Sequence, residues 1–231
     1  MPPRDSFAAH RAMRTRMGVL VAAGQDGVGA SVTAALLARE AQSHGARVLL
    51  VGPALRAQRI AAMFGVALPA ADAPPTRLDR DIHVCGSIPN LVDADVIISV
   101  PSARAQYLLD AVDELAAHTE PTNALVLAQR GAASLAASFA VLKLILGRRP
   151  QCSASVAACG DADVTALHDA AERWLGHQLH VAPAIPMDPT LPVALGAGLS
   201  LAEAVADTAL ITAAGALWSA LASSAHTGAL A

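Results

Sequence analysis

Apolar residues in this chain gather into short uninterrupted runs that alternate with longer segments of helical periodicity. The runs are typical of strands buried on both faces of a parallel sheet. They occupy residues 18–23, 47–51, 95–100, 124–128 and 154–158. The helical segments cover residues 31–44, 55–64, 105–118, 132–146 and 164–175. This alternation predicts a doubly wound α/β fold, in which a mostly parallel sheet carries helices on both faces.

The remaining segments complete one domain. Residues 1–16 are polar and contain arginine, which indicates an N-terminal extension, and residues 17–231 are expected to form a single α/β domain. Further expected elements are a loop at 69–75, a short strand at 82–85, a last strand and turn over 179–188, and a closing helix at 201–221. A break in that closing helix is expected near Gly215, because glycine is a poor helix former.

Composition and charge narrow the classes of function. Hydrophobic residues make up 54% of the 231 residues and charged residues 15%, which is typical of a globular protein. The net charge is −3 and aromatic residues are 3%, so nucleic acid is not an expected partner. No secretory signal and no membrane-length apolar run is present, which predicts a cytoplasmic protein. Cys85, Cys152 and Cys159 lack CxxC spacing and are expected to be buried, reduced thiols.

The first apolar run leads directly into a glycine-rich loop and then a helix. The loop consists of Gly24, Gln25, Asp26, Gly27, Val28, Gly29, Ala30 and Ser31. Glycines at a helix N-terminus allow backbone N–H groups to surround phosphates. A working phosphate loop also needs a lysine for the β- and γ-phosphates and a Ser or Thr for Mg²⁺. Ser31 is in register for the second role, whereas Ala30 stands at the lysine position and Lys143 is the only lysine in the chain.

From this loop onward the chain resembles the MinD/ParA group of P-loop ATPases. The family motif K-G-G-x-G-K-[ST] corresponds to residues 25–31, so Gln25 and Ala30 replace both signature lysines. The family's second strand ends in an aspartate where this chain has Gly52. The aspartate of its Walker B strand corresponds to Ser99. The resemblance implies that these four positions have lost the groups that bind and activate ATP.

Other segments extend the resemblance over residues 18–221. Residues 125–143 resemble the family's V-V-T-T-P-E-P-T-S segment and the helix after it. Residues 185–188 match its I-P-x-D, and residues 198–203 its G-x-x-L-x-E. The similarity is nearest to the flagellar-number regulators FlhG (FleN). The runner-up is the BcsQ group of cellulose-synthesis accessory proteins, which also lacks the usual loop lysine. The resemblance implies a bacterial, non-catalytic regulatory or scaffold protein, with a role in flagellar placement or number.

The missing groups predict that ATPase activity is lost. No cofactor or metal is expected, although ATP or ADP binding without hydrolysis stays open because Gly27 and Gly29 can still hold an anion. Asp26 places a negative charge beside that site. The other interpretation is that the glycines only form a tight turn between strand and helix. An ATP-dependent dimerisation switch, as in the parent family, is the alternative in another class. The expected state is a monomer or a nucleotide-independent dimer.

The chain termini give two weaker indications. Asp5 and Arg11 resemble positions of the FlhG element D-Q-A-x-x-L-R, which engages the GTPase FlhF, and this implies a protein partner; a solvated tail is the alternative. The C-terminal segment contains no Lys or Arg, so a direct membrane anchor is not expected. Trp218 is therefore expected to be a core residue. Recruitment to a cell pole or to a membrane-associated machine would go through protein partners.

Overall fold

An eight-stranded sheet forms the centre of the computed structural model, which describes residues 16–67, 74–89, 93–120, 122–205 and 208–228. The strand order is β3-β4-β2-β5-β1-β6-β7-β8, and all neighbours are parallel except β3 and β4. The strands are β1 (Met17–Ala23), β2 (Val48–Val51), β3 (Thr76–Asp79), β4 (Ile82–Cys85), β5 (Val96–Ser99), β6 (Thr122–Ala128), β7 (Ser153–Cys159) and β8 (His180–Ile185). The expected doubly wound, mostly parallel α/β fold is confirmed.

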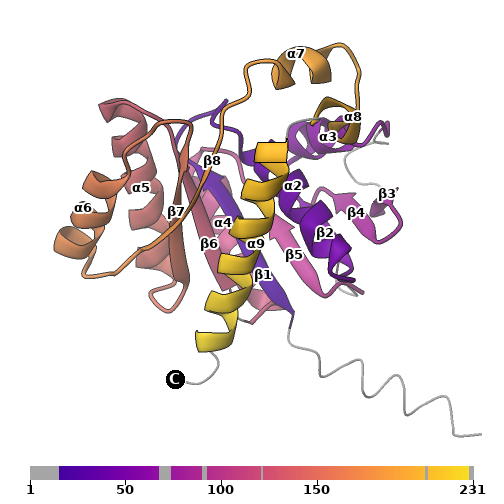
Figure 1. Ribbon diagram of the computed structural model, residues 1–231. Coiled ribbons are helices and arrows are strands. Elements are labelled where there is room, and N and C mark those ends of the chain that lie inside the picture. Colours follow the sequence, from indigo (N-terminus) through magenta and orange to yellow (C-terminus); the bar gives the residue numbers. More distant parts are fainter. Residues whose placement is uncertain (1–15, 68–73, 90–92, 121, 206–207, 229–231) are drawn as a thin grey trace, which may run out of the picture.

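Helices cover both faces of this sheet (Figure 1). One face carries α2 (Ala30–Ser43), α3 (Ala54–Met63) and α9 (Thr208–Gly228). The other carries α4 (Ala105–His118), α5 (Ala132–Arg148) and α6 (Thr165–Leu175). The short helices α7 (Leu191–Gly196) and α8 (Leu201–Ala204) add a small third cluster against the outer side of α2.

Side chains alternate between the two faces along each strand, which explains the uninterrupted apolar runs. In β6, Leu125 and Leu127 pack toward α2 and α9, whereas Ala124 and Val126 pack toward α4 and α5. All four are fully buried. A strand that is covered on both sides has no solvent face, so its residues are mostly apolar. Buried polar exceptions in the described strands are Ser99 in β5, Asn123 in β6 and Ser155 in β7.

Three local features differ from the sequence prediction. The antiparallel edge strand β3 was not expected, because Leu78 is its one buried side chain. Helix α7 was not expected for the same reason, since only Leu191 of that helix is buried. The expected break at Gly215 is wrong: α8 ends at Ala204, and a separate helix, α9, begins at Thr208. Gly215 lies inside α9, where a side chain would approach Glu40 Oε1 of α2 to 3.4 Å.

An ion-pair cluster fastens the amino-terminal ends of two neighbouring strands. The Arg47 side chain, just before β2, donates hydrogen bonds of 2.9 Å to both carboxylate oxygens of Asp95, just before β5. Asp93 accepts a further hydrogen bond from the same guanidinium. Hydrogen bonding to Asp95 raises the pKa of Arg47 above its ordinary value. This cluster lies at the edge of the sheet opposite the glycine loop, so its role is in holding the strands together.

The three cysteines are buried and none forms a disulfide, as expected. Burial raises the pKa of the Cys85 thiol to about 12 and those of Cys152 and Cys159 to about 11. These groups are therefore neutral thiols at physiological pH, without the thiolate character of a reactive cysteine. Within the described residues, no helix combines the length and the apolar character needed to cross a membrane.

Candidate functional site

The glycine loop lies at the carboxyl edge of the sheet, directly after the central strand β1. The neighbours of β1 are β5 and β6, and the helices that follow β1 and β6 cover opposite faces. This is a topological switch point, the place where open α/β sheets bind ligands. Figure 1 shows the loop end of β1 directed toward the same side of the molecule as the start of α3. The fold therefore places the loop where a phosphate site is expected.

Two glycines give the loop its shape. Gly27 has φ +86° and Gly29 has φ +101°, conformations that a residue with a side chain rarely adopts. Gly29 is the residue before α2, and its carbonyl accepts the first helical hydrogen bond from Thr33 N at 2.8 Å. No side chain caps this helix N-terminus. The backbone thus retains the form in which amide groups at a helix start can meet an anion.

The cation that such a loop requires is absent from its usual position. Ala30 is the first residue of α2 and is only 4% exposed, so its methyl group is part of the core. The sole lysine, Lys143, lies exposed on α5. It is about 16 Å along the helix axis from the start of α5, at roughly 1.5 Å per residue. Lys143 therefore points to solvent away from the carboxyl edge and cannot serve the loop.

The two positions that correspond to family aspartates lie beside the loop but carry no acid. Ser99 is the last residue of β5 and pairs with Leu20 of β1 and Val51 of β2. Gly52 follows β2 and is buried. A side chain at Gly52 would meet Val100 O at 3.0 Å and Arg56 Cβ at 3.2 Å. The structure thus brings the sequence-predicted positions to one edge of the sheet, and at Gly52 it leaves little room for the family's aspartate.

Gly24 has a packing role that the sequence did not indicate. A Cβ atom at this position would lie 2.3 Å from the carbonyl carbon of Ala137 and 2.6 Å from its oxygen. The backbone of α5 therefore passes directly against the start of the loop. Glycine at position 24 is required by the contact between the loop and α5, whether or not a phosphate binds.

An arginine that sequence reasoning did not single out contacts the loop. Arg56, in the first turn of α3, donates a hydrogen bond of 2.7 Å from Nη2 to Oδ1 of Asp26. The arginine side chain is 12% exposed and the aspartate side chain 78% exposed. Burial lowers the pKa of Arg56, the charge of Asp26 opposes that effect, and Arg59 adds to it. The loop therefore carries one ion pair with α3, between groups that are 30 residues apart in the chain.

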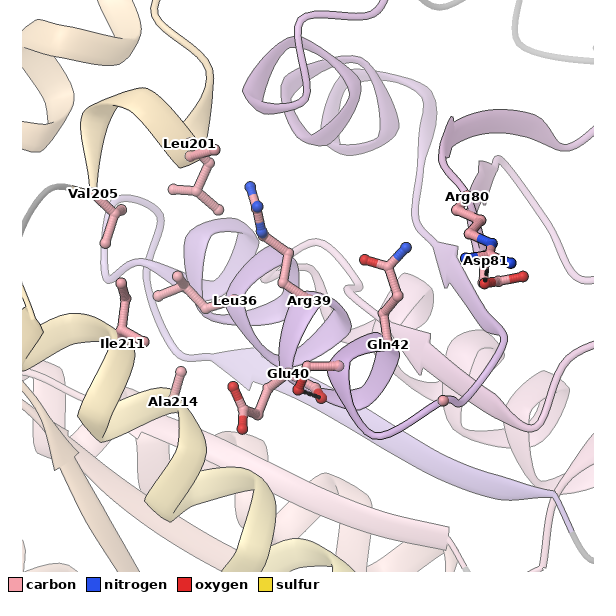
Figure 2. A pocket seen from close by; sticks show the side chains of 13 residues that line it. Leu36, Arg39, Glu40, Gln42, Arg80, Asp81, Leu201, Val205, Ile211 and Ala214 are labelled. Carbon is pink, nitrogen blue, oxygen red and sulfur yellow. Dashed lines mark hydrogen bonds and ion pairs between the residues drawn. The ribbon is translucent and has the colours of Figure 1, made fainter.

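A separate groove of about 750 Å³ lies away from the loop, along the outer side of α2 (Figure 2). Leu36, Leu201, Val205 and Ile211 line its apolar part, and Arg39, Glu40, Arg80 and Asp81 line its polar part. Figure 2 shows charges of both signs around it and no convergent set of polar groups. Among the described residues no cluster of His, Cys, Asp and Glu could hold a metal ion.

Structural comparison relates this architecture to known proteins. The fold superposes on MinD with Mg-ADP from Pyrococcus horikoshii with a TM-score of 0.68 at 15% identity, covering 93% of this chain and 98% of that one. A chain of the MinC:MinD cell division protein complex from Aquifex aeolicus superposes with a TM-score of 0.60 at 16% identity, covering 86% of this chain and 93% of that one. A ParA family ATPase from Chlorobium tepidum superposes with a TM-score of 0.60 at 17% identity, covering 87% of this chain and 96% of that one. The chain has the MinD/ParA fold. No protein-family model matches the sequence, and no curated protein is detectably similar to it.

Most of the candidate site residues that were predicted from the sequence lie in the described part of the chain. The glycine loop, Gly52 and Ser99 follow or end the strands β1, β2 and β5 at the same edge of the sheet. Asp5 and Arg11 lie outside the described residues. Arg56 was missed because its contact with the loop depends on how β1 and β2 are arranged. One feature of the sequence did point to it. Arg56 closely follows Gly52, at the start of a helix that the fold brings to the loop edge.

Proposed function

We propose that this protein is a non-hydrolysing protein of the MinD/ParA fold that regulates or scaffolds other proteins through direct contacts. The observation that carries the proposal is the loop itself, where Ala30 is buried at the lysine position and Ser99 replaces the Walker B acid. Phosphoryl transfer needs positive charge and Mg²⁺ held around the phosphates, and one such charged clamp contributes about 10³-fold or more in rate. A loop without the lysine and both acids is expected to give negligible turnover.

Exposed apolar side chains around the loop edge support a role in protein contacts. Leu55 on α3, Tyr107 on α4, Met187 after β8, Val193 on α7 and Leu199 before α8 are all exposed. Each lies on a segment that follows the carboxyl end of a strand. Apolar and aromatic groups of this kind are enriched in protein interfaces. Aquifex MinD, which has the same fold, forms a complex with MinC.

One alternative function has a specific observation in its favour. An ATP-dependent dimerisation switch requires a cation at the loop, and Arg56 is such a cation. Its guanidinium, however, is already engaged by Asp26 at 2.7 Å. The aspartate also adds a negative charge beside any phosphate. We therefore favour the nucleotide-independent function.

The state of association with and without nucleotide distinguishes the two functions. We expect multi-angle light scattering to give the same molar mass in the absence of nucleotide, with ADP-Mg and with ATP-Mg. A monomer or a constant dimer would both agree with the proposal. A doubling of mass that requires ATP-Mg, and that is lost in Arg56→Gln, would contradict it and establish the switch.

The cellular setting that we propose is flagellar placement or number control, in the cytoplasm, with recruitment to a pole through partners. It rests on the similarity to FlhG and on Asp5 and Arg11, which correspond to the element that engages an FlhF-like GTPase. The alternative setting is cellulose synthesis or secretion, as in the BcsQ group, where the loop lysine is also absent. The identity of the neighbouring genes, flagellar or cellulose-related, separates these settings.

A further inference from the structure

The ion pair between the glycine loop and α3 joins a largely buried side chain to an exposed one. Arg56 is held by its helix, since its backbone N–H donates to Pro53 O at 2.7 Å and its Cβ packs close to Gly52. Its side chain is largely buried. Asp26 is mostly exposed and lies next to Gly27, whose positive φ sets the turn of the loop. The arginine is thus the end of the contact that α3 holds in place, and the aspartate is the end that faces solvent.

The charges around this contact require a partner for the arginine. A guanidinium that loses most of its hydration is costly to leave unpaired. Arg59, one turn further along α3, is a like charge and does not compensate it. Asp26 is the only charged residue in the loop segment 24–31. The aspartate therefore neutralises Arg56, and at the same time it gives the loop a negative charge.

We propose that the Asp26–Arg56 pair is an autoinhibitory latch, which closes the glycine loop onto α3 and withholds Arg56 from phosphate groups. This inference rests on the proposed function, because a protein that acts without nucleotide needs a means of weakening phosphate binding at a loop with this glycine backbone. In the latched state the loop presents one carboxylate and no free cation to an incoming anion. Opening the latch leaves Arg56 as a cation beside amide groups that are suited to phosphate.

The test compares anion binding before and after the latch is removed. Isothermal titration calorimetry with sodium pyrophosphate is carried out on the wild type, on Asp26→Asn and on the double variant Asp26→Asn/Arg56→Gln. We expect Asp26→Asn to bind pyrophosphate about tenfold more tightly or better, because one repelling charge is removed and one attracting charge is released. The double variant is expected to lose that gain. A parallel titration with ATP-Mg shows whether a nucleotide-borne polyphosphate gains equally.

A matched control is available at the same edge of the sheet. Asp161 is 75% exposed and pairs with Arg130 at 3.0 Å. Asp161→Asn therefore removes the same charge from an equally exposed aspartate without touching the loop, although its partner Arg130 is exposed where Arg56 is largely buried. Its pyrophosphate affinity is expected to equal that of the wild type. An equal gain in Asp161→Asn, no gain in Asp26→Asn, or a gain that persists in the double variant would each overturn the latch.

Hydrogen exchange measures the closing of the loop without any ligand. We expect the loop amides of residues 24–31 to exchange about two- to fivefold faster in Asp26→Asn. This is the effect of losing an ion pair in which one partner, the aspartate, is exposed to solvent. Arg56→Gln is expected to give the same acceleration, and the double variant no more than either single one. Additive effects, or no effect, would overturn the latch. Neither the pyrophosphate titration nor hydrogen exchange involves ATP turnover. A failed latch would therefore leave the proposed loss of hydrolysis standing, and phosphate release tests that loss separately.

Discussion

Gly24→Ala is expected to destabilise the protein by about 3 kcal/mol, the upper part of the range for overpacking a filled core. The new methyl group would lie 2.3 Å from the Ala137 carbonyl carbon and 2.5 Å from its Cβ. Relief requires α5 to move as a whole, because Leu142 and Ile145 of that helix are fully buried against the sheet. Urea unfolding followed by circular dichroism gives the free energy of unfolding directly.

Gly147→Ala is the matched control on the same helix. A Cβ at Gly147 meets no atom within 4 Å, and its φ is not in the left-handed region. Alanine there is expected to be neutral or to stabilise the helix by up to about 1 kcal/mol. If Gly24→Ala were as well tolerated as Gly147→Ala, the packing explanation for Gly24 would be wrong. The glycine would then have to be explained by a ligand that requires close approach to the backbone.

The second large effect is expected for Trp218→Ala, at about 3–5 kcal/mol of destabilisation. Trp218 is 8% exposed and packs with Leu217 and Leu221 of α9 in the core on the α2 face. Its ring lies 6.5 Å from the ring of His44, centre to centre. Removing the indole leaves a cavity beneath α9 that small neighbouring side chains cannot fill. The same urea titration measures the loss.

Trp174 supplies the control, because it is the only other tryptophan and is 73% exposed on α6. Trp174→Ala is expected to change the free energy of unfolding by less than about 0.5 kcal/mol. If Trp218 served as a lipid anchor instead, Trp218→Ala would leave stability unchanged and reduce sedimentation with anionic vesicles. That pattern would refute its assignment as a core residue.

The sequence predicted most of the fold because the central strands are buried on both faces. Runs such as Val19–Ala23 and Val48–Val51 are uninterrupted, and glycine follows each of them closely. Elements with a single buried side chain, such as β3 with Leu78 and α7 with Leu191, leave no comparable pattern. The break before α9 was misplaced because one glycine costs a helix only about 1 kcal/mol, and Gly215 lies within α9. The capping box of Ser200 and Glu203 begins a separate short helix instead.

The site was predicted only as far as it is local in the chain. The glycine loop is contiguous, so its shape and its missing lysine can be recognised from residues 24–31 alone. The contacts of Gly24 with Ala137 and of Asp26 with Arg56 join distant segments, and they depend on helix positions that no periodicity specifies. No pattern in the chain indicates the contact between Gly24 and Ala137. For the contact between Asp26 and Arg56, the sequence shows an arginine shortly after Gly52, but it does not show that this side chain points toward the loop.

Release of inorganic phosphate at saturating ATP-Mg tests the central claim most directly. The wild type and Ser31→Ala, which removes the hydroxyl that a working loop would use for Mg²⁺, are measured side by side with Arg56→Gln. The account predicts that all three give the same background rate, because the loop lysine and both family acids are missing and Arg56 is paired with Asp26. A steady-state rate above background in the wild type that Ser31→Ala and Arg56→Gln both abolish would contradict it.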